Sequence, residues 1–182
     1  MSQEIEGMVR ASVIAILIAA AAGQPARAAD PLCKLVLDAM AKQTATPSHL
    51  YATEVMALRG GKPKATESIY AGGAIYIQVR GQWKRSPMSI QDMQKQREEN
   101  VRNAKSMTCR YLRDEAVNGE AAAVYHSQAE TEDGKSESTL WLSKRSGLPL
   151  RSESDVDVGG GEKRHLTIRY DYGGVRPPAG VQ

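Results

Sequence analysis

The residues that could carry out chemistry are few in this sequence and lie far apart. The histidines are His49, His126 and His165, and the cysteines are Cys33 and Cys109. Metal sites gather such ligands at short, regular spacings, which these positions lack. The sequence also lacks the Gly-x-Ser-x-Gly elbow of a serine nucleophile and the Cys-x-x-Cys pair of a redox centre. We therefore predict no catalytic residue, metal or cofactor, and expect that the protein is not an enzyme.

Acidic residues alternate along one segment near the C-terminus. Glu153, Asp155 and Asp157 stand two positions apart, just before Gly159-Gly160-Gly161. Residues at this spacing in a strand share one face, so the carboxylates could hold a hard cation. The segment lacks the loop spacing of a known calcium site. We interpret it as a solvated acidic face.

The N-terminal residues 1–28 have the pattern of a secretory signal peptide. Arg10 precedes the apolar run of residues 11–22, and the cleavage pattern Ala26-Arg27-Ala28 follows a polar break. The apolar run is shorter than the roughly 20 residues that a membrane-spanning helix needs. We expect residues 29–182 to be the exported protein, with no transmembrane segment, and translation could begin at Met8 rather than Met1.

Export would place the cysteines in an oxidising compartment. An even number of cysteines in an exported chain favours a disulfide, here between Cys33 and Cys109. Closing so long a loop stabilises a fold by about 4 kcal/mol on the chain-entropy model. Asp30-Pro31-Leu32 precedes Cys33, where a lipidation signal has small residues. We therefore do not expect a lipid anchor on this cysteine.

Charge is dispersed along the chain. The formal net charge is +3, from 24 Lys and Arg and 21 Asp and Glu, and Phe is absent. Nucleic-acid-binding proteins usually show a basic block, which this chain does not have. We expect no nucleic-acid partner, and a core built from Leu, Ile, Val, Met, Ala and Tyr.

Most of the chain alternates apolar and polar residues with the period of a β-strand. Helical spacing interrupts this pattern in two places, over residues 31–44 and 89–104. In the second helix Ile90, Met93, Arg97, Val101 and Ala104 share one narrow face, so it should lie over the sheet rather than inside it. We predict strands over residues 49–58, 64–70, 74–80, 83–85, 107–115, 121–131, 135–143, 148–158 and 163–172.

Short connections between these strands predict an antiparallel sheet. Asn118-Gly119 and Asp133-Gly134 are typical of tight hairpin turns. Eight or nine strands with only two helices can curl into a half-barrel, and the helices would cover its concave face. We expect a single α+β domain over residues 29–182, an antiparallel β half-barrel with an N-terminal and a central helix.

The segment from Leu140 to Leu150, which reads Leu-Trp-Leu, a polar turn and Gly-Leu-Pro, resembles a hairpin of the LolA-like superfamily. The C-terminal segment from Tyr170 to Pro178 is similar to the usual ending of that superfamily. The resemblance implies a periplasmic half-barrel, lidded by helices, that carries a lipid or a lipoprotein. The absence of Phe and of a lipidation signal departs from the lipoprotein carrier and its receptor, which favours a smaller ligand or a protein partner.

Methionines and large rings are the candidate lining of such a cavity. Met side chains adapt to irregular apolar spaces. The alternative is that these residues simply form the core. We predict that Trp141 and Leu142 define opposite faces of the sheet, so that only one can line a cavity. The candidate ligand-binding residues are Met56, Tyr76, Trp83, Met88, Met93, Met107, and Trp141 or Leu142.

The sequence thus leads to two hypotheses about function. The first is a periplasmic, non-enzymatic protein that binds a lipid or another amphiphile. The second is a periplasmic interaction or regulatory protein whose cavity is filled and holds no ligand.

Overall fold

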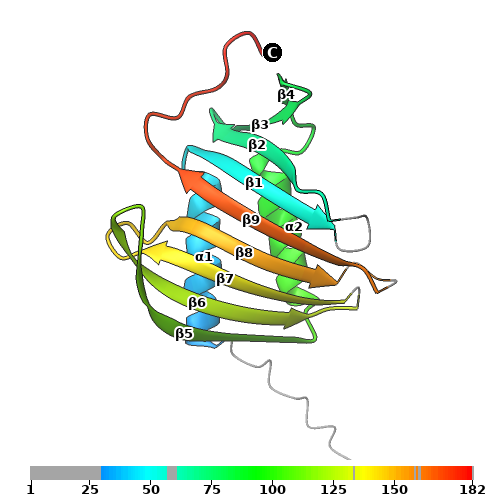
Figure 1. The fold of residues 1–182 in the computed structure, drawn as a ribbon, viewed down its shortest axis with the longest axis vertical. Helices are drawn as coiled ribbons and strands as arrows, with labels where there is room; N and C mark the ends of the chain where they lie inside the picture. The colour runs from blue at the N-terminus through cyan, green and yellow to red at the C-terminus, as the bar shows by residue number, and fades with distance from the viewer. Residues whose placement is uncertain (1–29, 57–60, 133, 158, 160, 182) are drawn as a thin grey trace, which may run out of the picture.

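The computed structural model describes residues 30–181 apart from residues 57–60, 133, 158 and 160, so the expected signal peptide lies outside the described residues. The described chain forms one sheet and two helices (Figure 1). The helices are α1 (Pro31–Ala45) and α2 (Ile90–Arg102). The strands are β1 (Ser48–Met56), β2 (Lys64–Ala71), β3 (Ala74–Val79), β4 (Gln82–Arg85), β5 (Ser106–Val117), β6 (Glu120–Glu130), β7 (Lys135–Ser143), β8 (Pro149–Asp157) and β9 (Lys163–Asp171).

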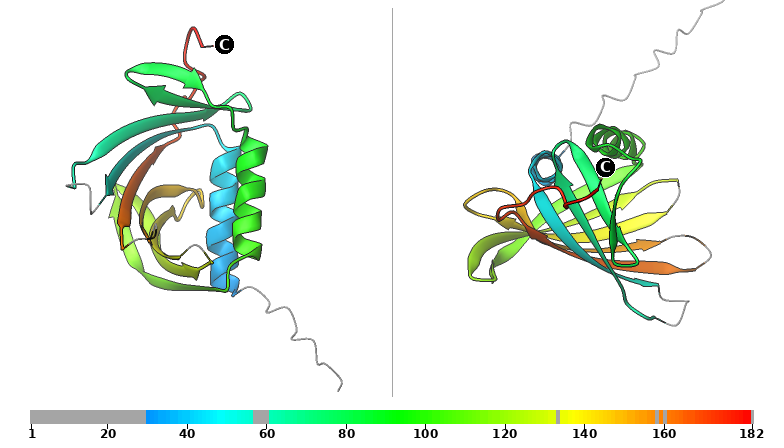
Figure 2. Two further views of the ribbon diagram at one scale, coloured as in Figure 1. Left: turned by 90° about the vertical axis from the view of Figure 1, so that its right-hand side faces the viewer. Right: turned by 90° about the horizontal axis from the view of Figure 1, so that it is seen from above.

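All neighbouring strands are antiparallel, in the order β4-β3-β2-β1-β9-β8-β7-β6-β5. Hairpins join every neighbouring pair except β1 and β9, the first and last strands, which meet with Ala52 opposite Ile168. This pairing joins the meander of β1 to β4 to the meander of β5 to β9. In the sequence, α2 lies between the two meanders. The sheet curls around both helices, which lie side by side on its concave face (Figure 2). The expected fold, an α+β antiparallel half-barrel with two helices, is confirmed.

Local sequence explains where several elements begin and turn. Asp30 caps α1 by accepting a hydrogen bond from the Leu32 amide at 2.9 Å. Ser89 and Asp92 form a capping box at the start of α2, in which each side chain accepts from the other residue's backbone. Asn118 and Gly119 have φ of 51° and 84°, the left-handed conformation that the expected two-residue turn requires.

Two apolar clusters hold the helices to the concave face. In the first, Val36 and Ala39 of α1 pack against Leu140 and Leu142 of β7. In the second, Ile90 and Met93 of α2 pack on a buried group from four strands, which consists of Leu50, Tyr70, Ile75 and Tyr170. Each helix therefore packs on a different half of the sheet.

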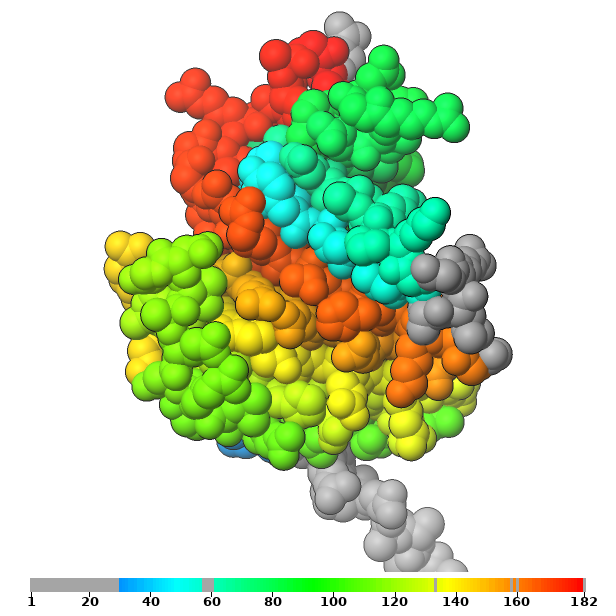
Figure 3. Space-filling model, viewed as in Figure 1, coloured from blue at the N-terminus to red at the C-terminus, as the bar shows by residue number. Residues whose placement is uncertain are grey.

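The opposite, convex face consists of strand residues over most of its area (Figure 3). Ala122, Val124 and Trp141 form a buried cluster on this face. A second cluster contains Ile69 and Tyr76, and it is covered by Val175 and Val181 of the C-terminal segment. The convex face therefore has a core of its own, separate from the helices.

The expected disulfide joins Cys33 to Cys109, with Cα atoms 5.1 Å apart. Both cysteines are buried. The bond fixes α1 to β5, the strand at one edge of the sheet. Within the described residues, neither helix is long and apolar enough to cross a membrane.

Candidate ligand-binding grooves beside the first helix

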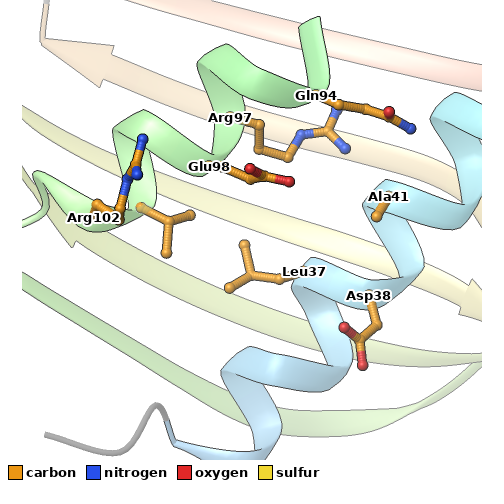
Figure 4. A pocket seen from close by; sticks show the side chains of 8 residues that line it. Leu37, Asp38, Ala41, Gln94, Arg97, Glu98 and Arg102 are labelled. Atoms are coloured by element: carbon orange, nitrogen blue, oxygen red, sulfur yellow. The ribbon is translucent and has the colours of Figure 1, made fainter. Parts of the chain in front are cut away.

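A groove of about 580 Å³ runs between α1 and α2 (Figure 4). We call it the interhelical groove. Its apolar walls come from Leu37 and Ala41 of α1 and from Val101 of α2. Polar and charged side chains complete the lining: Asp38, Gln94, Arg97, Glu98 and Arg102.

The amino-acid content of α2 explains why this groove stays open. Ile90, Met93 and Val101 are its apolar residues, and no residue of the helix is buried. A helix with so narrow an apolar stripe makes few close contacts with its neighbours. The second wall of the groove is therefore only lightly held against the rest of the protein.

Arg97 occupies an unusual position on that stripe. Figure 4 shows its side chain reaching from α2 into the space between the helices. Its Nη1 is enclosed and has no hydrogen-bond partner among the described residues. Burial lowers the pKa of the Arg97 guanidinium from its usual value. The positive charge also acts on Tyr70 and Tyr170, and it lowers their pKa values against the larger upward effect of burial.

A second groove, of about 830 Å³, runs along α1 and is lined by residues of α1, β6 and β7. We call it the hairpin groove. Its apolar lining includes Ala39, Tyr125, Leu142 and Leu35, and Leu35 is 40% exposed. Leu35 is thus an apolar side chain open to solvent at the side of a groove.

The lysines beside the hairpin groove are all engaged. Lys34 pairs with Asp38 at 2.6 Å, and the Lys42 ammonium donates to the Ser146 carbonyl at 2.6 Å. Lys144 pairs with Asp114, and these contacts hold the lysine side chains in place around the apolar lining. Asp38 lines both grooves, so they adjoin each other across α1.

Small polar residues line the middle of the concave face. Ser127, Ser138 and Ser154 stand in register on β6, β7 and β8, and the Ser138 hydroxyl donates to the Ser154 hydroxyl at 2.9 Å. The same row continues to Cys109 on β5 and to Leu166 on β9.

The structure divides the candidate ligand-binding residues between the two faces of the sheet. Leu142 lines the hairpin groove. Met93 lies in the cluster under α2, where its sulfur accepts a hydrogen bond from the Tyr70 hydroxyl at 3.5 Å. Met56 is six positions from Leu50 on β1, and Met107 is two positions from Cys109 on β5. Residues an even number of positions apart in a strand point to the same face, so both methionines belong to the concave side.

Three of the predicted rings lie on the convex side instead. Tyr76 and Trp83 pack with the C-terminal segment, and Trp141 is buried beneath Arg151, whose Cζ is 4.9 Å from the ring centre. Met88 is exposed before α2. Tyr76 and Trp83 therefore do not share the predicted concave lining with Met93, because strand alternation turns them to the other face. Of the alternatives Trp141 and Leu142, it is Leu142 that faces the concave side. The expected opposition of Trp141 and Leu142 is confirmed.

Sequence reasoning did not single out Arg97, Leu37 or Leu35 as functional residues. Arg97 was recognised only as one member of the narrow face of α2. The signal that could have pointed to Arg97 is its position among Ile90, Met93 and Val101 on the apolar face of the helix. Arginines are rarely buried unless they are paired, so an arginine on an apolar face is unusual.

Two of the three histidines, His49 and His165, take part in ordinary pairs on the convex face. His49 lies 2.9 Å from a Glu67 oxygen and stacks on Tyr51, with ring centres 4.2 Å apart. His165 lies 2.9 Å from an Asp155 oxygen. The described residues contain no group of three or more side chains placed to hold a metal ion. Asp155, one of the alternating acidic residues, is thus engaged with a histidine.

Comparison with known proteins adds structural neighbours. No family model matches the chain, and no curated protein sequence is similar to it. The lipoprotein LppX of Mycobacterium tuberculosis is a solved structure with 9% identity and a TM-score of 0.40, over 77% of this chain and 93% of that chain. LprF from Mycobacterium bovis has 12% identity and a TM-score of 0.43, over 82% and 97% of the two chains.

A LolA superfamily protein from Nitrosomonas europaea has 10% identity and a TM-score of 0.28, over 81% of this chain and 94% of that chain. At such values these similarities concern the fold alone, and no ligand or partner follows from them. The open antiparallel sheet with two helices on its concave face is the half-barrel that the hairpin and the C-terminal segment led us to expect.

Proposed function

We propose that this protein is a non-enzymatic binding protein that holds a lipid or another amphiphile in the periplasm. The interhelical groove is the observation that carries the proposal. It is a groove of about 580 Å³ with apolar walls and charged groups around them. This combination suits a molecule with an apolar chain and a polar head.

The energetics of such a groove favour chain binding. Each methylene removed from water contributes about 0.8 kcal/mol, so a short length of chain lying along Leu37, Ala41 and Val101 gives useful affinity. Because no residue of α2 is buried, the helix can shift at low cost to admit the chain. In this proposal α1 is the fixed wall, held by the disulfide, and α2 is the movable one.

The disulfide also supports the proposed location. Disulfides persist in oxidising compartments such as the periplasm and are rare in the reducing cytosol. The bond between Cys33 and Cys109 is buried and links two distant parts of the chain, as expected of a structural disulfide in an exported protein.

Native mass spectrometry of the protein purified from cell envelopes tests the proposal. We expect an adduct with the mass of an amphiphile, and removal of that adduct by organic extraction. Leu37→Trp should fill the interhelical groove and abolish the adduct. Leu35→Trp is the matched control, because Leu35 lies two residues away on the same helix but lines only the hairpin groove. Absence of any adduct, together with failure to bind added laurate, would contradict the proposal.

The second candidate function is an interaction or regulatory protein without a ligand. The two filled clusters on the concave face favour it, because they occupy space that a large internal cavity would need. Affinity purification from cell envelopes distinguishes the two candidates. One stoichiometric protein partner and no adduct would favour this second function.

A further inference from the structure

Two arginines of the described chain, Arg97 and Arg164, each have an enclosed nitrogen without a hydrogen-bond partner, and of these Arg97 lines the interhelical groove. Arg113 pairs with Glu115 at 2.6 Å, and Arg151 pairs with Glu153. Arg169 lies on the exposed convex face with its Cζ 4.0 Å from the centre of the Tyr51 ring. Arg97 is at least half enclosed, and its Nη1 meets no acceptor among the described residues.

The acidic residues nearest to Arg97 in the groove do not compensate for its charge. Asp38 is engaged with Lys34 at 2.6 Å. Glu98 lines the same groove but is exposed and makes no ion pair with a described residue. An enclosed cation without a partner costs several kcal/mol, and natural proteins retain such groups where they serve a purpose.

We propose that Arg97 binds the anionic head group of an amphiphile, a carboxylate or a phosphate, while the apolar walls of the interhelical groove hold its chain. This inference rests on the proposed function and adds the class of ligand. A guanidinium presents parallel N–H donors that match two oxygens of either head group. Carboxylate and phosphate share this chemistry, and the choice between them is left to experiment.

Neighbouring groups supply further donors for the head group. Gln94 lies one turn before Arg97 and lines the same groove, so its amide can donate to a bound oxygen. The Tyr70 hydroxyl now donates to the Met93 sulfur at 3.5 Å, and sulfur is a weak acceptor. An anion beside Arg97 would be a better acceptor for that hydroxyl. The apolar surroundings strengthen each of these contacts because water does not compete fully there.

The test compares probes that share one chain and differ in charge. Isothermal titration calorimetry measures binding of laurate, dodecyl phosphate, uncharged monolaurin and inorganic phosphate to the intact protein. We expect the wild type to bind one or both anionic amphiphiles about ten to a hundred times more tightly than monolaurin, as a charged hydrogen bond predicts. The preferred head group identifies the ligand as a carboxylate or a phosphate.

Arg97→Met should remove that preference while monolaurin binding persists, and Arg97→Lys should restore part of it. Arg110→Met is the charge-matched control, because Arg110 is exposed on β5 and lines neither groove. A folding readout accompanies the series. Without ligand, Arg97→Met should unfold at a higher urea concentration than the wild type, since an enclosed unpaired charge is replaced by an apolar side chain.

The possible results separate this inference from the proposed function. Equal wild-type affinity for laurate, dodecyl phosphate and monolaurin, with loss of all three in Leu37→Trp, would overturn the role of Arg97 and leave the amphiphile-binding function standing. Failure of every amphiphile to bind would overturn both. Inorganic phosphate binding as tightly as dodecyl phosphate would show that the chain contributes nothing, and this would overturn the inference as well.

Discussion

Cys33 of α1 and Cys109 of β5 are covalently joined although 76 positions separate them in sequence. The closed loop contains β1 to β4 and all of α2. The disulfide therefore fixes α1 to β5 at one edge of the sheet, whereas α2 contains no cysteine and is held by side-chain packing and by the hydrogen bond from Tyr70 to Met93. This difference makes α1 the rigid side of the interhelical groove.

Removing the disulfide should destabilise the protein without changing its fold. A loop of this length predicts a loss of about 4 kcal/mol in the free energy of unfolding on the chain-entropy model. Urea denaturation with and without a reductant measures the loss. The variant Cys33→Ala with Cys109→Ala is the control, because its denaturation midpoint should not respond to reductant. An equal midpoint for the oxidised wild type and the double variant would contradict this prediction.

Leu142 should contribute much more to stability than Leu35, although both line the hairpin groove. Leu142 is 4% exposed and packs against Val36 and Ala39, whereas Leu35 is 40% exposed. Leu142→Ala should cost about 2–5 kcal/mol, as buried leucines do. Leu35→Ala should cost at most about 0.5 kcal/mol. Chemical denaturation of both variants provides the measurement, and similar losses would show that the helix does not pack on β7 as described.

The fold was largely predictable because its signals are local. Alternation marked the strands, Asn118-Gly119 marked a turn, and Ser89 with Asp92 marked the start of α2. The pairing of β1 with β9 depends on contacts between distant segments, so no local pattern specifies it.

The candidate site was much less predictable. Alternation showed that Trp141 and Leu142 point to opposite faces, but which face meets α1 depends on tertiary packing. Tyr76 has a large ring of the kind that often lines a cavity, yet the C-terminal residues Val175 and Val181 cover its cluster. The enclosure of Arg97 depends on how α1 and α2 sit together, which their separate patterns do not reveal.

The tyrosines beneath α2 should make stability fall at high pH. Burial raises the pKa of Tyr70, Tyr170 and Tyr172 above the ordinary value of 10.0. The unfolded chain loses these protons near pH 10 while the folded protein keeps them. Their contribution to stability is therefore complete below about pH 10 and declines as the pH rises above it. Urea midpoints at several pH values from 8 to 11 measure the decline.

Tyr172→Phe isolates part of this effect. The Tyr172 hydroxyl donates to the Pro149 carbonyl at 2.7 Å, so the variant should lose about 1 kcal/mol at neutral pH. Above pH 10 the free energy of unfolding of the variant should fall less steeply than that of the wild type. The variant has one fewer tyrosine that ionises more readily in the unfolded chain than in the folded protein. Equal slopes in the two proteins would exclude Tyr172 as a source of the alkaline transition.

Loss of the capping box should loosen α2 selectively. The Ser89 hydroxyl accepts from the Asp92 amide at 3.1 Å, and Ser89→Ala should cost about 1 kcal/mol, whereas Ser89→Gly should cost less. Since α2 has no buried residue, most of this loss should appear as opening of the helix itself. Amide hydrogen exchange should therefore become about five times faster in α2 and remain unchanged in β9.

Asp30→Ala is the matched control, because it removes the N-cap of α1, where the Asp30 carboxylate accepts from the Leu32 amide. Exchange should then quicken in the first turn of α1 alone, since the disulfide and the packing of Val36 hold the rest of that helix. If α2 is the movable wall, Ser89→Ala should also change the rate at which laurate dissociates, and Asp30→Ala should not. An unchanged dissociation rate in both variants would show that ligand enters the groove without opening α2.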